Sequence, residues 1–273
     1  MTLPIYQIDA FTDALFAGNP AAVVPLERWP ADSVLQAIAA ENNLSETAFF
    51  APDREGVADY RLRWFTPTIE VELCGHATLA TGWLILNRLE PKRRKVRFAT
   101  MAGPLTVSRP DGEEGEDVAL ELDFPARPAT QLPMPKGVAD ALGKRPSAFW
   151  LATKYMAVFD DPTHIRALKP DLGWIKSLPR GDGLIVTAPG DEPGVDFLSR
   201  YFAPHAGIDE DPVTGSAHCT LAPYWAERLG KSVLTGHQVS RRGGLVGCRL
   251  ETGRVTLSGM ARLYLTGEIH VDA

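Results

Sequence analysis

One glutamate and two glycine-led segments carry the residues best suited to chemistry. Glu46 lies in residues 44–47, between an expected helix and an apolar strand that starts at Ala48. A carboxylate at the mouth of such a strand is partly removed from water, which raises its pKa. That suits a group that accepts and returns a proton near neutral pH. The alternative is an exposed glutamate that caps the local turn.

Gly75 and Gly215 each end an irregular stretch and open an apolar helix, expected over residues 77–89 and 217–229. Glycine lets a ligand approach the backbone closely. The first turn of a helix has unpaired N–H groups and a partial positive charge, so it binds carboxylate or phosphate. If a pseudo-twofold axis relates the two helices, both could stabilise the charge that develops when a carbon acid loses its proton. Otherwise they are ordinary helix starts.

Two further polar residues lie at these turns. His76 follows Gly75 and either supports an anion-binding turn or is a hydrogen-bonded structural histidine. Asp211 ends the acidic run 209–211, and Pro212 restricts its backbone four residues before the helix start at Gly215. Acidic runs of this kind are commonly solvated turns, so Asp211 is a candidate on position alone.

Residues at the first turn also suit two other chemistries. Cys74 would have a lowered pKa at a helix N-terminus, and could act as a nucleophile, as an acid/base thiol or as a buried packing residue. Glu70, Glu72 and His76 could be read as metal ligands. No second histidine stands nearby, so a metal site is disfavoured.

The elements that position these residues follow from hydrophobic patterning. A helix over 32–41 is expected to begin with Asp32 as its cap. The proline-rich stretch 125–135 is typical of an interdomain linker. A further helix is expected at 137–142, and strands at 5–11, 21–24, 47–51, 60–65, 96–100, 105–107, 118–124, 150–159, 183–188 and 196–202, with two more within 254–271.

An internal echo points to a duplicated domain. Residues 63–67 (RWFTP) resemble residues 200–204 (RYFAP), which lie 137 residues further on. The two glycine-led turns are separated by 140 residues. Two matched segments in the same order, near half-chain separation, predict domains at 1–125 and 126–273, unless the match is a coincidence. The final strand, near 262–273, could belong to either domain.

Composition excludes several classes of partner. The 273 residues have a net charge of −6 and a pI near 5.6, so no basic field favours nucleic acid or an anionic membrane. No apolar run approaches the roughly 20 residues of a membrane helix, and the N-terminus lacks the pattern of a signal peptide. Three cysteines without a Cys-x-x-Cys pair predict neither a disulfide framework nor structural zinc. A cytoplasmic protein is expected.

Together the motifs resemble the phenazine-biosynthesis isomerase (PhzF-like) family, and they do so in family order over nearly the whole chain. The matching stretches are residues 9–11, 18–20, 44–49, 65–67, 72–78, 210–217 and 238–244. No Gly-x-Gly-x-x-Gly, phosphate loop or Gly-x-Ser-x-Gly motif competes with this reading.

The resemblance implies an α+β protein with the diaminopimelate-epimerase-like fold, in which two pseudo-symmetric domains each wrap a mixed or antiparallel sheet around a central helix. The active site then lies between the domains, the protein is a homodimer, and no cofactor or metal is used. The family's proton-shuttling glutamate falls on Glu46, with support from His76 and Asp211. The substrate contacts fall on Asn19, Ser45, Gly75, Gly215 and Ser216.

The implied function is an isomerase that moves a proton within a small carboxylated substrate, such as a cyclic amino or hydroxy acid. The namesake reaction uses a dihydro-hydroxyanthranilate. Related epimerases use two opposed cysteines, of which Cys74 matches one, while the second half has Thr214 before Gly215. Single-glutamate transfer is therefore favoured over a cysteine-assisted racemase or epimerase. A non-catalytic binding protein on the same fold and a metal-dependent hydrolase are weaker alternatives.

Overall fold

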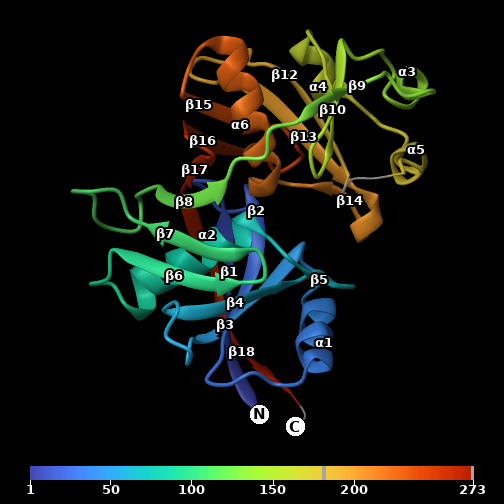
Figure 1. Cartoon of the computed structure of the whole chain (residues 1–273). Coiled ribbons are helices and arrows are strands. Elements are labelled where there is room, and N and C mark those ends of the chain that lie inside the picture. Colours follow the sequence, from blue (N-terminus) through green and yellow to red (C-terminus); the bar gives the residue numbers. More distant parts are fainter. Residues whose placement is uncertain (180–182, 272–273) are drawn as a thin grey trace. The chain divides into compact units, whose positions relative to one another are not determined.

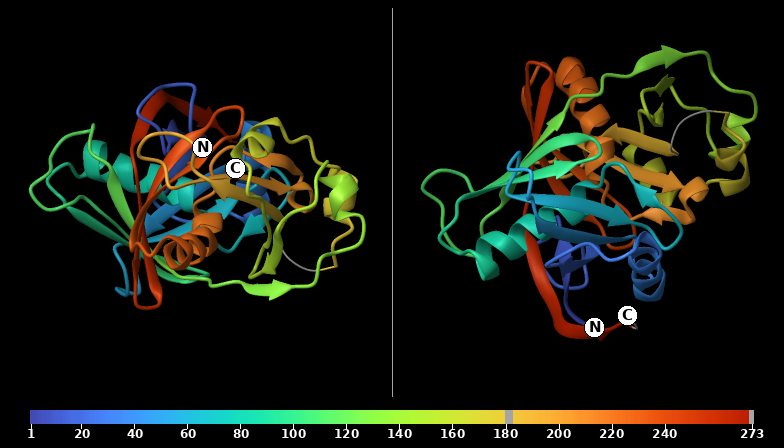
Figure 2. Two further views of the ribbon diagram at one scale, coloured as in Figure 1. Left: turned by 90° about the horizontal axis from the view of Figure 1, so that it is seen from above. Right: turned by 60° about the horizontal axis from the view of Figure 1, so that its bottom comes forward.

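The structure is a computed structural model that describes residues 1–179 and 183–271 and divides into two compact units. Unit 1 contains Met1–Asp123 and the residues from Ser258 onward, and unit 2 contains Phe124–Leu257. The last strand, β18 (Ala261–His270), pairs antiparallel with β1 (Thr2–Ala10), and the two ribbons run side by side in Figures 1 and 2. The final strand, which the sequence left open to either domain, thus lies in the sheet of unit 1.

In unit 1, antiparallel hairpins alternate with parallel crossovers. The strands β1 and β2 are antiparallel, β2 and β3 parallel, β3 and β4 antiparallel, β4 and β5 antiparallel, β4 and β6 parallel, and β6, β7 and β8 successively antiparallel. The bounds are β2 Asn19–Pro25, β3 Glu46–Pro52, β4 Tyr60–Phe65, β5 Glu70–Val71, β6 Lys95–Thr100, β7 Gly103–Ser108 and β8 Leu120–Pro125.

Helix α2 (Gly75–Leu84) lies in the core of unit 1 and is buried along its whole length. It packs against β1, β2, β3, β7 and β18, and it continues as a π-helical turn, η1 (Ile85–Leu89). An apolar surface on every side of a helix requires cover on every side. The fold provides that cover by wrapping the sheet around α2, as the resemblance implied.

Helix α1 (Asp32–Asn42) crosses between the parallel strands β2 and β3 and buries Leu35. The predicted cap is wrong. Ala31 is the N-cap residue and provides no side-chain hydrogen bond, while the Asp32 carboxylate accepts a hydrogen bond from Arg63 Nη1 at 2.8 Å. The Asp32 carboxylate therefore binds Arg63 of the neighbouring strand β4 and does not cap the helix, contrary to what the local sequence predicts.

Unit 2 repeats the strand pattern. The strands β10 and β11 are antiparallel, β11 and β12 parallel, β12, β13 and β14 successively antiparallel, β13 and β15 parallel, and β15 and β16 antiparallel. The bounds are β9 Thr130–Leu132, β10 Ala148–Leu151, β11 Tyr155–Val158, β12 Leu184–Pro189, β13 Phe197–Ala203, β14 Ile208–Asp211, β15 Val233–Gln238, β16 Gly244–Glu251 and β17 Arg254–Gly259.

Two predictions in unit 2 are corrected. The strand expected over 150–159 is a hairpin, because β10 and β11 pair from Ala148↔Val158 to Leu151↔Tyr155. The proline-rich stretch 125–135 is not a free linker, because β9 within it pairs with β10. The helices of unit 2 are α3 Val138–Ala141, α4 Pro162–Ala167, α5 Leu172–Lys176, the 3₁₀ turn η2 Pro204–Ala206 and α6 Gly215–Leu229.

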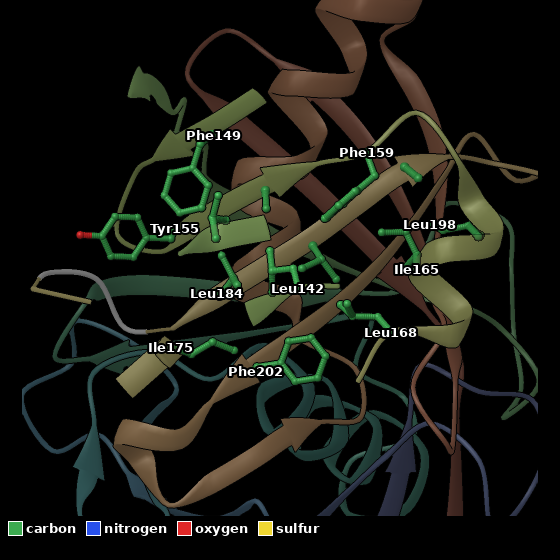
Figure 3. Packing of buried hydrophobic residues seen from close by; sticks show 14 residues of the cluster. Leu142, Phe149, Tyr155, Phe159, Ile165, Leu168, Ile175, Leu184, Leu198 and Phe202 are labelled. Carbon is green, nitrogen blue, oxygen red and sulfur yellow. The ribbon is translucent and has the colours of Figure 1, made fainter. Parts of the chain in front are cut away.

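A cluster of aromatic and aliphatic side chains forms the core of unit 2 that Figure 3 shows. It fills the space between one face of β10–β13 and the short helices α3, α4 and α5. Along β12 the cluster takes the alternate residues Leu184, Val186 and Ala188, which point to this face of the sheet. Its labelled members are Leu142, Phe149, Tyr155, Phe159, Ile165, Leu168, Ile175, Leu184, Leu198 and Phe202.

The matched RWFTP segment of unit 1 forms a compact side-chain clasp. Arg63 donates two parallel hydrogen bonds to Glu70, both at 2.7 Å, and its guanidinium lies 5.1 Å from the centre of the Phe65 ring. Two parallel N–H···O bonds and a cation–π contact are the geometry that arginine offers and lysine does not. The clasp ties β4 to β5, just before α2 begins.

Unit 2 contains the same clasp. Arg200 donates to Glu210 at 2.6 and 2.9 Å, and its guanidinium lies 5.0 Å from the centre of the Phe202 ring. Here it ties β13 to β14, just before α6 begins. The two units share the order of their strands, the parallel or antiparallel direction of each pairing and the same side-chain clasp. They are therefore structural repeats.

Helix α2 and strand β7 approach each other closely at Gly82, and a substitution there tests how tightly the sheet packs around the helix. A Cβ atom added at Gly82 would lie 2.5 Å from Val107 Cγ1, and Val107 has a stiff side chain. We expect Gly82→Ala to lower the free energy of unfolding by roughly 1 kcal/mol or more in urea denaturation, because overpacking outweighs the better helix propensity of alanine.

In a Val107→Ala background the same change should cost less, since both Cγ atoms of residue 107 are removed and only its Cβ, at 2.7 Å, still overlaps the added methyl group. A stabilising effect of Gly82→Ala in the otherwise unchanged protein would contradict the close approach of α2 and β7.

Candidate active site

Glu46 is the first residue of β3, and it pairs in parallel register with Ala21 of β2. Its side chain is 14% exposed, and its Oε2 atom lies 3.3 Å from Nε2 of His76. The predicted proton carrier is thus largely removed from water, at the mouth of a buried strand. The structure brings Glu46 and His76 together, as predicted, although the strands β3, β4 and β5 lie along the chain that joins them.

Asn19 determines where the proton of His76 resides. It is the first residue of β2 and is fully buried, and its amide Nδ2 lies 3.1 Å from Nδ1 of His76. An amide nitrogen can only donate, so Nδ1 accepts and the imidazole proton is on Nε2. The N–H of His76 is therefore on the nitrogen 3.3 Å from Glu46 Oε2, although these two atoms form no hydrogen bond with each other in this state.

His76 is the second residue of α2 and is 2% exposed. Burial lowers its pKa from 6.5 to about 3, because the surrounding core cannot solvate an imidazolium. The ring is neutral at physiological pH, so its contact with Glu46 is not an ion pair. At 3.3 Å it lies just beyond the usual range of an N–H···O hydrogen bond.

Cys74 is the N-cap residue of α2, with extended backbone angles (φ −135°, ψ 114°), and is 4% exposed. Its Sγ lies 3.5 Å from Nδ1 of His76. The Glu46, Cys74 and His76 side chains offer donor atoms within 4.8 Å of one another, and among the described residues they form the group able to hold a metal ion. The Glu70, Glu72 and His76 set is not assembled as such, because Glu70 binds Arg63.

In unit 2, Asp211 ends β14 and is 7% exposed. Its Oδ2 accepts a hydrogen bond from Thr214 Oγ1 at 2.5 Å. Gly215 opens the 15-residue helix α6 and half-buried Ser216 follows it, as predicted, with Thr214 as the extended N-cap residue (φ −114°, ψ 95°). This backbone closely matches that of Cys74 before α2.

Ser45 is half-buried directly before β3. Gly75 opens α2 and is buried. Both of the predicted substrate-contacting positions in this part of unit 1 therefore flank the Glu46–His76 pair in sequence and in structure. Their contact with substrate stays a prediction.

Sequence reasoning missed the side chains that brace the two helix starts. Thr78 Oγ1 donates to the Cys74 carbonyl at 2.5 Å, and His218 Nδ1 lies 2.8 Å from the Thr214 carbonyl. Each is the fourth residue after the N-cap, and each holds the N-cap carbonyl. The 140-residue offset between the glycines could have found this pair. Burial lowers the pKa of His218 to about 4.

Comparison with known proteins identifies the family. Residues 8–267 match the model of the PhzC-PhzF family, described as phenazine biosynthesis-like proteins. The chain belongs to this family. A Pseudomonas aeruginosa protein named as an uncharacterized isomerase is 49% identical over 99% of this chain and 100% of its own length. Like its named relatives, this phenazine biosynthesis-like protein is an isomerase.

Solved structures agree with the family and its fold. The crystal structure of a phenazine biosynthesis PhzF family protein from Enterococcus faecalis has a TM-score of 0.91 and 42% identity, covering 99% of this chain and 100% of that one. A hydroxyproline epimerase from Agrobacterium vitis has 11% identity, with a TM-score of 0.65 over 100% of this chain and 93% of that one, and shares the fold. The α+β epimerase-like fold is thus confirmed.

Within residues 1–179 and 183–271, none of the helices combines the length and apolar character that crossing a bilayer requires.

The two buried histidines of this phenazine biosynthesis-like protein predict a pH dependence of stability. In the unfolded chain histidine titrates near pH 6.5, whereas His76 and His218 remain neutral until about pH 3 and 4. The unfolded state therefore binds more protons as the pH falls below 6.5, and each histidine costs up to about 1.4 kcal/mol of stability per pH unit.

Urea denaturation between pH 7 and pH 5 should show this loss, and His218→Asn should make it shallower. Replacement of exposed His205 by Gln serves as the control and should leave the slope unchanged. A slope that is identical in all three proteins would show that His218 is not held neutral.

Proposed function

We propose that Glu46 takes a proton from an activated carbon of a small carboxylated substrate and returns it at another position of the same molecule. The observation that carries this proposal is the 3.3 Å approach of the largely buried Glu46 carboxylate to the N–H of a neutral His76. Partial burial favours the protonated carboxyl group, and a cation in contact would oppose that effect. A neutral donor orients Glu46 while leaving it able to accept a proton.

His76 has a supporting role in this proposal. With Nδ1 bound to Asn19 and a pKa of about 3, the ring has no basic nitrogen to offer at neutral pH. It can still donate from Nε2, and a long contact in the free enzyme can shorten when substrate excludes water. His76 thus orients one oxygen of Glu46 and stabilises the carboxylate charge before the first transfer and after the second, when Glu46 is ionised.

The substrate carboxylate is proposed to bind the free backbone N–H groups at the start of α2, where Gly75 lets it approach closely. Gly215 and Ser216, at the start of α6, offer the same kind of group, and Asp211 offers a fixed acceptor. The structural repeat supports the prediction that both helix starts bind the same substrate. If this is so, substitutions in either unit should impair the same reaction.

These protein groups suit a small carboxylate whose reacting carbon is acidic. The substrate would also have a polar group that donates a hydrogen bond to Asp211. A dihydro-hydroxyanthranilate, the substrate of the namesake reaction, fits this description. The hydroxyproline epimerase with the same fold is seen with trans-4-hydroxy-L-proline, also a small hydroxylated carboxylate. Both compounds belong in a first panel of probes. A homodimer remains an expectation of family membership.

A cysteine-assisted racemase is the alternative, because Cys74 Sγ lies 3.5 Å from His76. Two observations weigh against it. A neutral imidazole does not stabilise a thiolate as an imidazolium would. The repeat places Thr214, not a second cysteine, at the matching N-cap, and its hydroxyl donates to Asp211. An alcohol engaged in this way is a poor carbon base.

Glu46→Gln tests the proposal, because it preserves shape and removes the base. We expect the variant to fold and bind carboxylates, but to lose deuterium incorporation from D₂O into the turned-over probe by roughly 10²–10⁴-fold, as measured by mass spectrometry. Glu41→Gln, at an exposed position of α1, is the matched control and should behave as the wild type does. Exchange at the wild-type rate in Glu46→Gln would rule out the assigned role.

Cys74→Ala separates the two mechanisms. The single-glutamate mechanism expects exchange within a few-fold of the wild-type rate, since the thiol transfers no proton. The racemase mechanism expects a loss comparable to that of Glu46→Gln, together with loss of any inverted product on chiral chromatography.

A further inference from the structure

One buried amide holds the turn that carries Asp211. Gln238 is the last residue of β15 and is fully buried. Its Oε1 accepts a hydrogen bond from the Thr214 backbone N–H at 2.8 Å, and its Nε2 donates to the Asp211 carbonyl at 2.7 Å. A single side chain therefore bridges both ends of the turn between β14 and α6.

These two bonds fix the orientation of the amide. A backbone N–H can only donate and a backbone carbonyl can only accept, so the oxygen and nitrogen of Gln238 cannot be exchanged. The nitrogen also lies 3.1 Å from Thr214 Oγ1. The hydroxyl must accept from Gln238 there, and its own proton is then directed to Asp211 Oδ2 at 2.5 Å. The hydrogen bonds thus run in one direction, from Gln238 through Thr214 to Asp211.

A second contact from the same segment holds the middle of the turn. Ser240 Oγ donates to the Pro212 carbonyl at 2.7 Å and accepts from the Gly243 N–H at 3.0 Å. Gly243 has a φ of +68°, a conformation that glycine adopts at little cost. The segment 238–243 therefore supports the Asp211 turn at both of its ends and at its middle.

We propose that Gln238 is a positioning residue that, through the Thr214 hydroxyl, fixes the Asp211 carboxylate in its acceptor form and orientation for the reaction. The inference rests on the proposed function, in which Asp211 binds substrate. It assigns roles to two side chains that touch no reacting atom. It also explains why the second unit has threonine at the N-cap where the first has Cys74, since a hydroxyl can accept and donate in the two required directions.

Thr214→Val tests the relay directly. Valine keeps the branched shape and the backbone N–H that binds Gln238, but it removes the hydroxyl between Gln238 and Asp211. We expect kcat for the exchange reaction to fall by at least about tenfold with a smaller change in KM, because small misplacements of positioning groups cost up to about 10²-fold. Thr214→Ser restores the hydroxyl and should recover kcat to within about threefold of the wild type.

Thr187→Val is the matched control. Thr187 is a fully buried threonine of unit 2 whose hydroxyl likewise accepts from an N–H, that of Trp225 at 3.0 Å, and donates to a carbonyl, that of Leu198 at 2.6 Å. Its loss should lower the melting temperature as the loss of Thr214 does, while kcat stays within about twofold of the wild type.

Crystal structures of the variants supply a readout that needs no substrate. The Asp211 carboxylate should leave its position in Thr214→Val and in Gln238→Met, and it should keep that position in Thr214→Ser and Thr187→Val. An unmoved Asp211 in Thr214→Val overturns the inference. If Glu46→Gln abolishes exchange while Thr214→Val matches Thr187→Val, the relay fails and the proposed function stands. Wild-type exchange in Glu46→Gln would instead remove the proposed function.

Discussion

The complete burial of helix α2 is the constraint on which the candidate site depends. Burying a charged side chain on a helix enclosed by the sheet would cost free energy. His76 is therefore neutral, and its ring has a single N–H group. Asn19, at the start of β2, donates to the other ring nitrogen, which leaves that N–H on the nitrogen 3.3 Å from Glu46, at the start of β3. The parallel pairing of β2 and β3 is what brings these two strand starts to the same end of the helix.

The two units show how one frame supports different chemistry. Each has the same strand order, the same arginine–glutamate–phenylalanine clasp and a side-chain donor on the N-cap carbonyl. They differ at the N-cap and two residues beyond it. Unit 1 has a thiol at the N-cap and a neutral imidazole beside Glu46, whereas unit 2 has a hydroxyl that anchors Asp211. Under the proposed function, proton transfer belongs to one repeat and a fixed carboxylate to the other.

Sequence alone predicted the features that local chemistry determines. The glycines opening α2 and α6, the apolar patterns and the RWFTP echo follow from backbone freedom and periodicity. Features set by residues distant in sequence were missed or left open: the bond of Arg63 to Asp32 and the reach of Gln238 to the Asp211 turn were missed, and the pairing of β18 with the first sheet was left open. The family resemblance implied a substrate contact for Asn19, but its bond to His76 depends on strand pairing that no local pattern encodes.

The protonation state of His76 tests this account most directly. Two-dimensional ¹H–¹⁵N NMR of protein labelled at the histidine ring nitrogens, with Asn19→Leu used to assign the His76 signals, reports which nitrogen carries a proton. The account predicts a neutral ring with its proton on Nε2 throughout pH 5–8. A positively charged ring in that range, or a neutral ring protonated on Nδ1, would contradict it, because Glu46 would then face a cation or a bare nitrogen.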